Sequence, residues 1–531
     1  MNWLRSLFTG RRGIQLAPDA IPVPWAPERI AIFERISACE LQADGSLPDP
    51  TFDLSDAHSL PECALGPGAS DAAGAYHVSW QHRCQINTLC AALHHAADDH
   101  TPARLAELYQ ALLAAPSGGS VIFIERIVKT GADTARMALL ARRLARTAPD
   151  EIAVTYAIAT LGVYGSQADC PLLMTLGLHE AFTQSCAITL CQLLGPEPAQ
   201  TAMWNLARRV HGWGRIHVVR MLATTGCPEI QQWLLRDGYK NIRMYSYLAY
   251  LCATGGKLLP ALQAGPADER LLVGAGEIIQ ALLDGYDAVN ETMAHYADGA
   301  AATLAYLQCV HRERPQQLQV ARALVDIAKM NNYGWDDAHL RHVRHLAKQA
   351  LALDYWPALV QDKLRYGTDA EFEVAASVAR TFHVDPWEFQ FAKQQRRERP
   401  QWYGLTETTD TTRVDRYVAL ALEQLDLTAP AGSMDFETRS AISWLAIGLR
   451  RFPGKGWPIL RAALAGGDDA NIANALDTLA KWRRSQWTGE AIAALEHAWR
   501  SETRADLKEQ MERVLQRSGA GTAGVMGAPT N

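Results

Sequence analysis

Short apolar runs at helical spacing recur through the middle of the chain, and each run ends near a glycine. Between residues 152 and 285 the glycines that follow these runs are Gly165, Gly195, Gly226, Gly255 and Gly285. Successive glycines are 30, 31, 29 and 30 residues apart. Because a fixed period in this range is typical of repeat proteins, the pattern predicts stacked helical repeats over this stretch.

The copy around Gly226 shows what one repeat predicts. Residues 215–226 carry apolar side chains at helical spacing, so they predict a helix with one buried face. Gly226 allows the left-handed backbone that often ends a helix, and Pro228 suits the first turn of the next helix. That second helix is expected to end at Gly238. A helix pair of this size cannot bury its apolar face alone, so we expect the copies to stack.

The rest of the chain divides by the same pattern. Residues 1–100 are rich in proline and predict an irregular N-terminal cap, with short helices at 26–39 and 81–97. Residues 101–391 predict the main block of helices, and 392–412 predict a polar connector. Residues 413–516 predict a second block of helix pairs, and 517–531 predict a disordered tail.

The second block repeats a motif of its own. Leu445-Ala446 and Leu479-Ala480 are 34 residues apart, and each pair is followed by two arginines, a turn with glycine and another helix. Over 102–310 and 436–516 the chain resembles HEAT-like repeats of the armadillo type. The resemblance implies an all-α fold, a right-handed α-solenoid of HEAT-like helix pairs behind the irregular cap. The period is shorter than the roughly 40 residues usual for HEAT units.

Composition narrows the functional classes. The formal net charge is −6, and 51 Lys and Arg residues stand against 57 Asp and Glu residues. This balance argues against a surface that grips nucleic acid throughout, although a local basic patch stays open. The ten cysteines form no CxxC pair, and no apolar run reaches the roughly 18–20 residues of a membrane span. We therefore expect a bacterial-type cytoplasmic protein with reduced cysteines.

A cluster of basic and aromatic residues near the centre of the repeats is the strongest candidate for a binding surface. Its members would line one face of successive repeats. The expected partner-binding residues are Arg208, Arg209, His211, Trp213, Arg215, His217, Arg220, Arg236, Lys240 and Arg243. Three interpretations are open for them: a solvated face over core tryptophans, a surface for an acidic protein partner, or a nucleic-acid contact.

Two histidine clusters contain residue types that bind metals. His95 and Asp99 share a helix face but supply only two ligands, and a metal site needs three or four. His339, His342 and His345 drift around their helix, which makes a common metal awkward. We therefore expect no metal and no cofactor. The chain also lacks a P-loop, a GxGxxG loop, a GxSxG elbow and an HExxH motif, which favours a non-enzymatic protein, while acid and base groups that only the fold brings together stay open.

Two functional hypotheses follow. The first is a non-enzymatic scaffold or adaptor that binds an unidentified protein on the concave face of the solenoid. It predicts that charge reversal at Arg215 and Arg220 abolishes partner capture without changing thermal unfolding. The second is a nucleic-acid-binding protein related in architecture to the HEAT-like alkylpurine DNA glycosylases, and it rests on architectural analogy alone.

Overall fold

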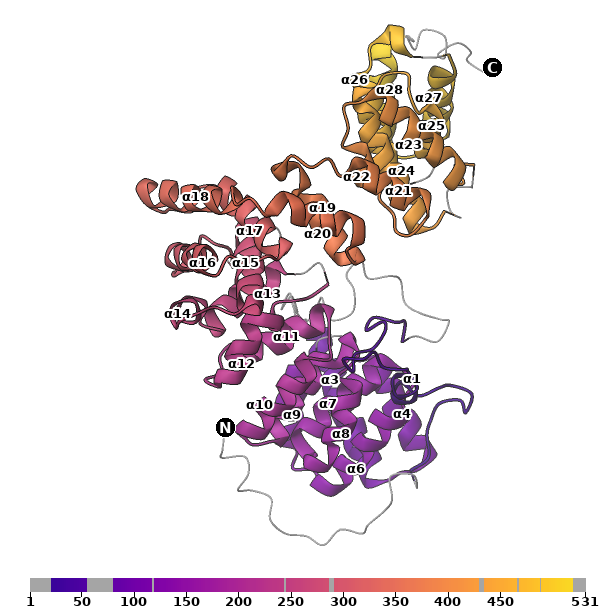
Figure 1. The fold of residues 1–531 in the computed structure, drawn as a ribbon. Coiled ribbons are helices and arrows are strands. Elements are labelled where there is room, and N and C mark those ends of the chain that lie inside the picture. The colour runs from indigo at the N-terminus through magenta and orange to yellow at the C-terminus, as the bar shows by residue number, and fades with distance from the viewer. Residues whose placement is uncertain are drawn as a thin grey trace, which may run out of the picture. The chain divides into compact units, whose positions relative to one another are not determined.

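The structure is a computed structural model. It describes residues 21–54, 80–116, 119–242, 245–285, 291–428, 434–465, 468–487 and 489–518. Within these ranges the chain forms 27 α-helices and no strand, so the prediction of an all-α protein is confirmed (Figure 1). The helices belong to two compact units, Met1–Ala352 and Leu353–Asn531. In the described ranges no helix is both long and apolar enough to cross a membrane.

A row of six helices forms the centre of the first unit, and each member packs against the next. They are α7 (Glu151–Tyr164), α9 (Glu180–Leu193), α11 (Gly212–Leu222), α13 (Ser246–Gly255), α15 (Glu269–Asp284) and α17 (Leu318–Lys329). These central helices are covered on several sides: nine of the 14 residues of α7 and ten of the 16 residues of α15 are buried. Their apolar runs therefore supply most of the core of this unit.

The helices between them flank the central row. They are α8 (Cys170–Leu176), α10 (Pro196–Ala207), α12 (Pro228–Trp233), α14 (Leu258–Gln263), α16 (Gly299–Glu313) and α18 (Asp337–Leu351). Among them α14 packs on α16 and α16 on α18, beside α13, α15 and α17 (Figure 1). The flanking helices differ in burial: four of the 12 residues of α10 and four of the 15 residues of α18 are buried, whereas eight of the 15 residues of α16 are.

The five periodic glycines mark the C-terminal ends of central helices. They lie directly after α7 and α15, two residues after the end of α9, at the last residue of α13, and in the turn between α11 and α12. Only Gly285 takes the left-handed conformation, with φ of +58°, so the expectation of that conformation at Gly226 is wrong. Gly255 is needed for close packing instead, because a Cβ there would lie 2.5 Å from the Ala223 carbonyl oxygen of α11.

A π-helical turn follows α12 and brings two backbone carbonyls into the interior. This turn, η5 (Leu234–Gly238), packs against α13 and α15. Its approach to α15 is so close that a Cβ on Gly274 would lie 1.9 Å from the Leu235 carbonyl oxygen. At the end of this turn the Asp237 and Gly238 carbonyls accept hydrogen bonds from a side chain of α11, which is described with the site below.

The N-terminal part of the first unit contains α1 (Ile32–Ser37), α3 (Trp80–Asp98), α4 (Pro102–Leu113), α5 (Ser120–Ile127) and α6 (Thr134–Thr147). The two short helices expected in the cap are present as α1 and α3. Arg29 fastens the cap to the helices, because its guanidinium donates to both carboxylate oxygens of Asp150, at 3.0 and 2.9 Å, and to the Tyr109 hydroxyl at 2.6 Å. Residues 1–20 and 55–79 of the predicted cap lie outside the described residues.

The second unit contains ten α-helices in its described residues. They are α19 (Trp356–Tyr366), α20 (Asp369–Val378), α21 (Trp387–Gln395), α22 (Trp402–Thr406), α23 (Thr411–Gln424), α24 (Phe436–Gly448), α25 (Trp457–Ala465), α26 (Asp469–Lys481), α27 (Gly489–Ser501) and α28 (Ala505–Ser518). Helices α22, α24, α26 and α28 pack in sequence, and α25 packs on α27 beside them. Their shared core is a single cluster of buried side chains that includes Trp387, Leu445 and Leu479.

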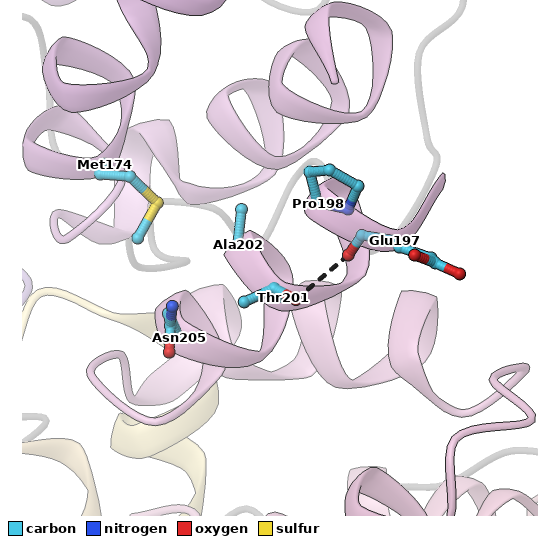
Figure 2. A pocket seen from close by; sticks show the side chains of 6 residues that line it. All are labelled: Met174, Glu197, Pro198, Thr201, Ala202 and Asn205. Atoms are coloured by element: carbon cyan, nitrogen blue, oxygen red, sulfur yellow. Dashed lines mark hydrogen bonds between the residues drawn. The ribbon is translucent and has the colours of Figure 1, made fainter. Parts of the chain in front are cut away.

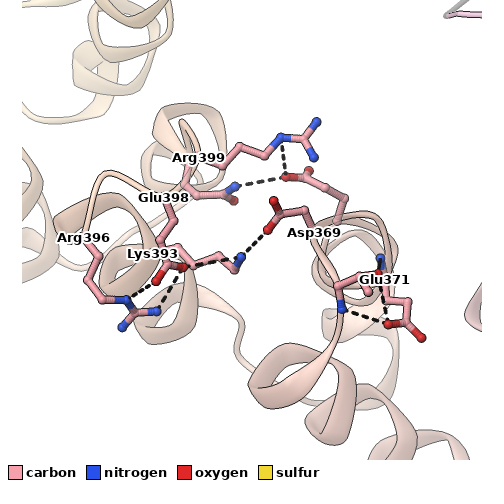
Figure 3. A network of polar contacts seen from close by, with 9 residues as sticks. Asp369, Glu371, Lys393, Arg396, Glu398 and Arg399 are labelled. Atoms are coloured by element: carbon pink, nitrogen blue, oxygen red, sulfur yellow. Dashed lines mark hydrogen bonds and ion pairs between the residues drawn. The ribbon is translucent and has the colours of Figure 1, made fainter. Parts of the chain in front are cut away.

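The stretch expected to be a connector, 392–412, is folded into this unit. It contains the end of α21, all of α22 and the start of α23, and it buries Trp402 and Leu405. Ion pairs tie it to α20 (Figure 3): Lys393 Nζ lies 2.5 Å from Asp369 Oδ1. The first two residues of the predicted tail, 517 and 518, are the last two of α28, and residues 519–531 lie outside the described residues.

Candidate functional site

Half of the predicted basic cluster lines one groove of the first unit. The groove has a volume of about 910 Å³ and is formed by the ends of α10 and α12, the residues that follow η5, and the loop around Asp44. The predicted residues that line it are Arg208, Arg209, His211, Arg215 and Lys240. The structure therefore brings together basic side chains that are up to 32 residues apart in the sequence.

Arg208 and Lys240 are the exposed basic residues of the groove. The Arg208 guanidinium lies over the Trp204 ring, 5.0 Å from its centroid, and donates to the Asn205 amide oxygen at 2.5 Å. Lys240 Nζ lies 3.0 Å from Asp237 Oδ1. Both side chains therefore reach solvent, and each contacts the residue three positions earlier in the chain.

Arg215 has a structural role that the sequence did not predict. It is only 5% exposed, and its guanidinium donates to backbone carbonyls on both sides: Ala207 at 2.8 Å and Asp237 at 2.7 Å. Longer contacts of 3.4 Å reach the Val210 and Gly238 carbonyls. Because this side chain joins α10 to the π-helical turn, we now expect charge reversal at Arg215 to lower stability as well, which differs from the expectation drawn from the sequence.

The loop around Asp44 closes one side of the groove. Arg209 Nε donates to the Gly45 carbonyl at 3.0 Å, and His211 Nε2 lies 3.7 Å from Asp44 Oδ2. Burial, together with the charge of Arg215, lowers the pKa of His211, so its ring is neutral at pH 7. Four cationic side chains, those of Arg208, Arg209, Arg215 and Lys240, thus face the carboxylates of Asp44 and Asp237, and the groove is electropositive.

A buried carboxylate that the sequence did not reveal, that of Glu180, lies beside the groove. It is 4% exposed and accepts the backbone N–H of Trp213 at the start of α11. Burial raises the pKa of Glu180 to about 7, against the lowering effect of its backbone hydrogen bonds. Gly212 makes the contact possible, since its φ is +60° and a Cβ there would lie 2.6 Å from Glu180 Oε2.

Asn241, which the sequence did not reveal either, links the same turn to the next repeat. Its Oδ1 accepts the Gly212 N–H at 2.7 Å, and its Nδ2 donates to the Gly212 carbonyl at 2.9 Å. Asn241 is 2% exposed although it lines the groove. No local signal identifies Glu180 or Asn241, because their partners are about one repeat away in the sequence.

The other predicted residues are dispersed. Trp213 is half-buried against Tyr247, with ring centroids 5.1 Å apart, and His217 is buried. Arg220 is exposed on α11 outside the groove, and Arg236 is paired with Asp268 at 2.6 Å. The remaining predicted residue, Arg243, lies outside the described residues.

A second hollow, of about 480 Å³, lies beside the groove and shares Met174 and Asn205 with it (Figure 2). Its polar side chains come mainly from the exposed face of α10. The Thr201 hydroxyl donates to the Glu197 carbonyl at 3.1 Å, in its own helix, so it is already satisfied. The six residues that line this hollow include one acid, Glu197, and no base, so the hollow only extends the space at one end of the groove.

The histidine clusters do not converge in the structure. His339 lies against the Trp335 ring, and its Nε2 is 3.2 Å from the Ala300 carbonyl oxygen, while His342 and His345 are exposed. In the part of the chain that the structure describes, no group of three or more His, Cys, Asp or Glu side chains could hold a metal ion. The nine described cysteines are free.

Comparison of the chain with models of protein families, with curated proteins and with solved structures gave no match.

Proposed function

We propose that this protein is a non-enzymatic interaction scaffold whose electropositive groove binds an acidic segment of another protein. In this proposal the helices form a right-handed α-solenoid of HEAT-like pairs, and the groove belongs to its concave face. The observation that supports this architecture is the central row of helices, in which each helix packs on the next. Among the helices that flank this row, α10 and α18 bury only four residues each. Repeat proteins commonly use such rows to build extended binding surfaces.

Two features of the groove favour an acidic partner: walls that hydrogen bonds keep in place, and an exposed arginine that can bind a carboxylate. Arg215 and Asn241 are held by backbone bonds and keep the walls in place. Among the described residues Arg208 donates to a neutral amide, that of Asn205, so a partner carboxylate can replace that bond with a stronger, charge-assisted one. Arginine and tryptophan are also enriched among the residues that contribute most to protein interfaces.

The nucleic-acid alternative has weaker support. Phosphate binding depends on many cations that are not already neutralised by the protein. Here Arg236 pairs with Asp268, while Lys240 and Arg270 share Asp237. The net charge of the chain is −6, and the groove cations without a carboxylate partner among the described residues are Arg208, Arg209 and the buried Arg215.

The proposal is tested by affinity capture from host lysate with three forms of the full chain: wild type, the Arg208→Glu/Lys240→Ser double variant, and Arg341→Glu as a charge-matched control on α18. Arg341 is exposed and lies outside the groove. We expect one stoichiometric protein to be captured by wild type and Arg341→Glu, with or without nuclease, and to be lost with the double variant.

Two results would contradict the proposal. Capture that survives in the double variant, with an unchanged unfolding curve, would exclude this groove as the binding surface. Capture that disappears on nuclease treatment would favour the nucleic-acid alternative, and its salt dependence would then be steep.

A further inference from the structure

The second unit has a groove of its own, in which two aromatic side chains are exposed. The groove has a volume of about 800 Å³ and lies between the turn before α21, the helix α22 and the end of α24. Tyr403 and Trp444 contact each other edge to face, with ring centroids 4.7 Å apart, yet they remain 54% and 39% exposed. An exposed aromatic pair in a groove is a common feature of protein-binding surfaces.

The backbone beneath this pair is held firmly. The Trp387 indole donates to the Leu405 carbonyl at 3.0 Å and so fixes the end of α22. Helix α24 approaches so closely that a Cβ on Gly448 would lie 2.5 Å from Thr406 Cβ. The two rings therefore sit on rigid elements, and a partner that covers them need not order the backbone on this side.

Three carboxylates line this groove: Glu407 and Asp385 are paired with arginines, and Asp410 accepts the Thr412 N–H at 2.7 Å. Glu407 accepts the Tyr403 hydroxyl at 2.8 Å and the Arg380 guanidinium at 2.5 Å. Asp385 accepts from Arg413 at 2.6 Å. A cationic ligand would have to displace these intramolecular partners.

One cation of the groove remains uncommitted. Arg450 pairs with Asp477 at 2.6 Å, whereas the neighbouring Arg451 is exposed and has no hydrogen bond or ion pair with any residue that the structure describes. Four arginines and three carboxylates line the groove, so the lining has a formal charge of +1, and the Arg451 guanidinium can form a bidentate bond with a carboxylate.

We propose that this groove, which we call the Tyr403–Trp444 groove, docks a short segment of another protein in which an acidic residue neighbours an apolar one. The apolar side chain covers the Trp444 and Tyr403 rings, and the carboxylate bonds to Arg451. Tryptophan, tyrosine and arginine are the residues that most often dominate the affinity of such interfaces. This proposal does not depend on the function assigned to the groove of the first unit.

The test begins with a phage-displayed library of random dodecapeptides selected on the immobilised full chain. We expect the enriched peptides to carry Asp or Glu next to an aromatic or aliphatic residue. Enriched peptides are then labelled with fluorescein, and their affinity is measured by anisotropy. We expect Trp444→Ala and Arg451→Glu each to weaken binding about tenfold or more, which corresponds to at least roughly 1.4 kcal/mol.

Matched controls establish whether the peptides bind at the Tyr403–Trp444 groove. Tyr366→Ala and Arg461→Glu alter an exposed aromatic and an exposed arginine elsewhere in the same unit, and should leave affinity unchanged. The Arg208→Glu/Lys240→Ser variant should also bind normally, so failure of the first groove would be recognised separately. Arg451 is exposed and forms no hydrogen bond or ion pair with the described residues, so its variant remains informative if Trp444→Ala unfolds.

Three outcomes would overturn the proposal. The first is a selection that yields no enriched peptide, or one that yields peptides rich in Lys and Arg. The second is peptide binding that Arg451→Glu and Trp444→Ala leave intact. The third is saturable binding of a labelled oligo-dT strand that is lost in Trp444→Ala, which would assign the groove to nucleic acid.

Discussion

Replacement of Arg215 by alanine should destabilise the first unit more than any surface change nearby. The change removes a guanidinium that donates to the Ala207 and Asp237 carbonyls at 2.8 and 2.7 Å and lies over the Trp233 ring, 5.3 Å from its centroid. The two contacts at 3.4 Å are near the limit of hydrogen bonding and contribute little.

The expected magnitude follows from these contacts. Each hydrogen bond from a charged donor contributes roughly 1.5–3 kcal/mol, and the ring contact adds about 0.5–1 kcal/mol. Two effects reduce the sum. Burial lowers the pKa of Arg215, so removal of the charge recovers part of its desolvation cost, and water can reach some carbonyls through the groove. We therefore expect a loss of about 3 kcal/mol in the free energy of unfolding, which is large for one substitution.

Urea unfolding followed by circular dichroism at 222 nm would measure this loss. Arg220→Ala is the matched control, because Arg220 lies on the same helix but is exposed, and it should change stability by less than about 0.5 kcal/mol. Arg215→Lys keeps the charge but cannot reach two carbonyls at once, so it should fall between the two. A loss below about 1 kcal/mol for Arg215→Ala would refute the structural role of this side chain.

Three further variants test the buried polar groups of the first unit. Asn241→Ala removes both bonds to Gly212 and should lower the unfolding free energy by about 2 kcal/mol in the same urea assay. The pKa of Glu180, raised to about 7, means that the folded state binds an extra proton between roughly pH 4.5 and 7, so this residue lowers stability as pH rises through that window. The unfolding free energy of wild type minus that of Glu180→Gln should therefore fall by up to about 3 kcal/mol between pH 5 and 8. His179, whose pKa is lowered to about 4, contributes with the opposite sign, but it is present in both proteins and cancels in the difference. A difference that does not change with pH would contradict the raised pKa of Glu180. Tyr306→Phe should be neutral or slightly stabilising in thermal unfolding, since the buried Tyr306 hydroxyl has no hydrogen-bond partner among the described residues, and a loss above about 1 kcal/mol would indicate a partner.

The sequence by itself determined where helices run and where many of them end. Apolar runs and the glycine period predicted α11, α12 and the ends of the central helices to within a few residues, because both signals act within one or two turns of the chain. The prediction of one buried face on α11 is wrong, because residues 214–219 are all buried. The sequence also identified the electropositive groove in part, because five basic residues near one repeat junction are visible as a cluster in the sequence.

Tertiary structure decided which of those basic side chains are exposed to solvent and which are buried in contacts within the protein. Arg215 and Arg220 are five positions apart and look alike in the sequence, yet one is buried among carbonyls 22 and 23 residues away and the other faces solvent. Gly45 meets Arg209 across 164 residues, and Gly212 turns left-handed beside a Glu180 carboxylate from the previous repeat. Helix periodicity is a local property, whereas burial, ion pairing and pKa depend on which distant segments pack together, and only the folded chain brings those segments into contact.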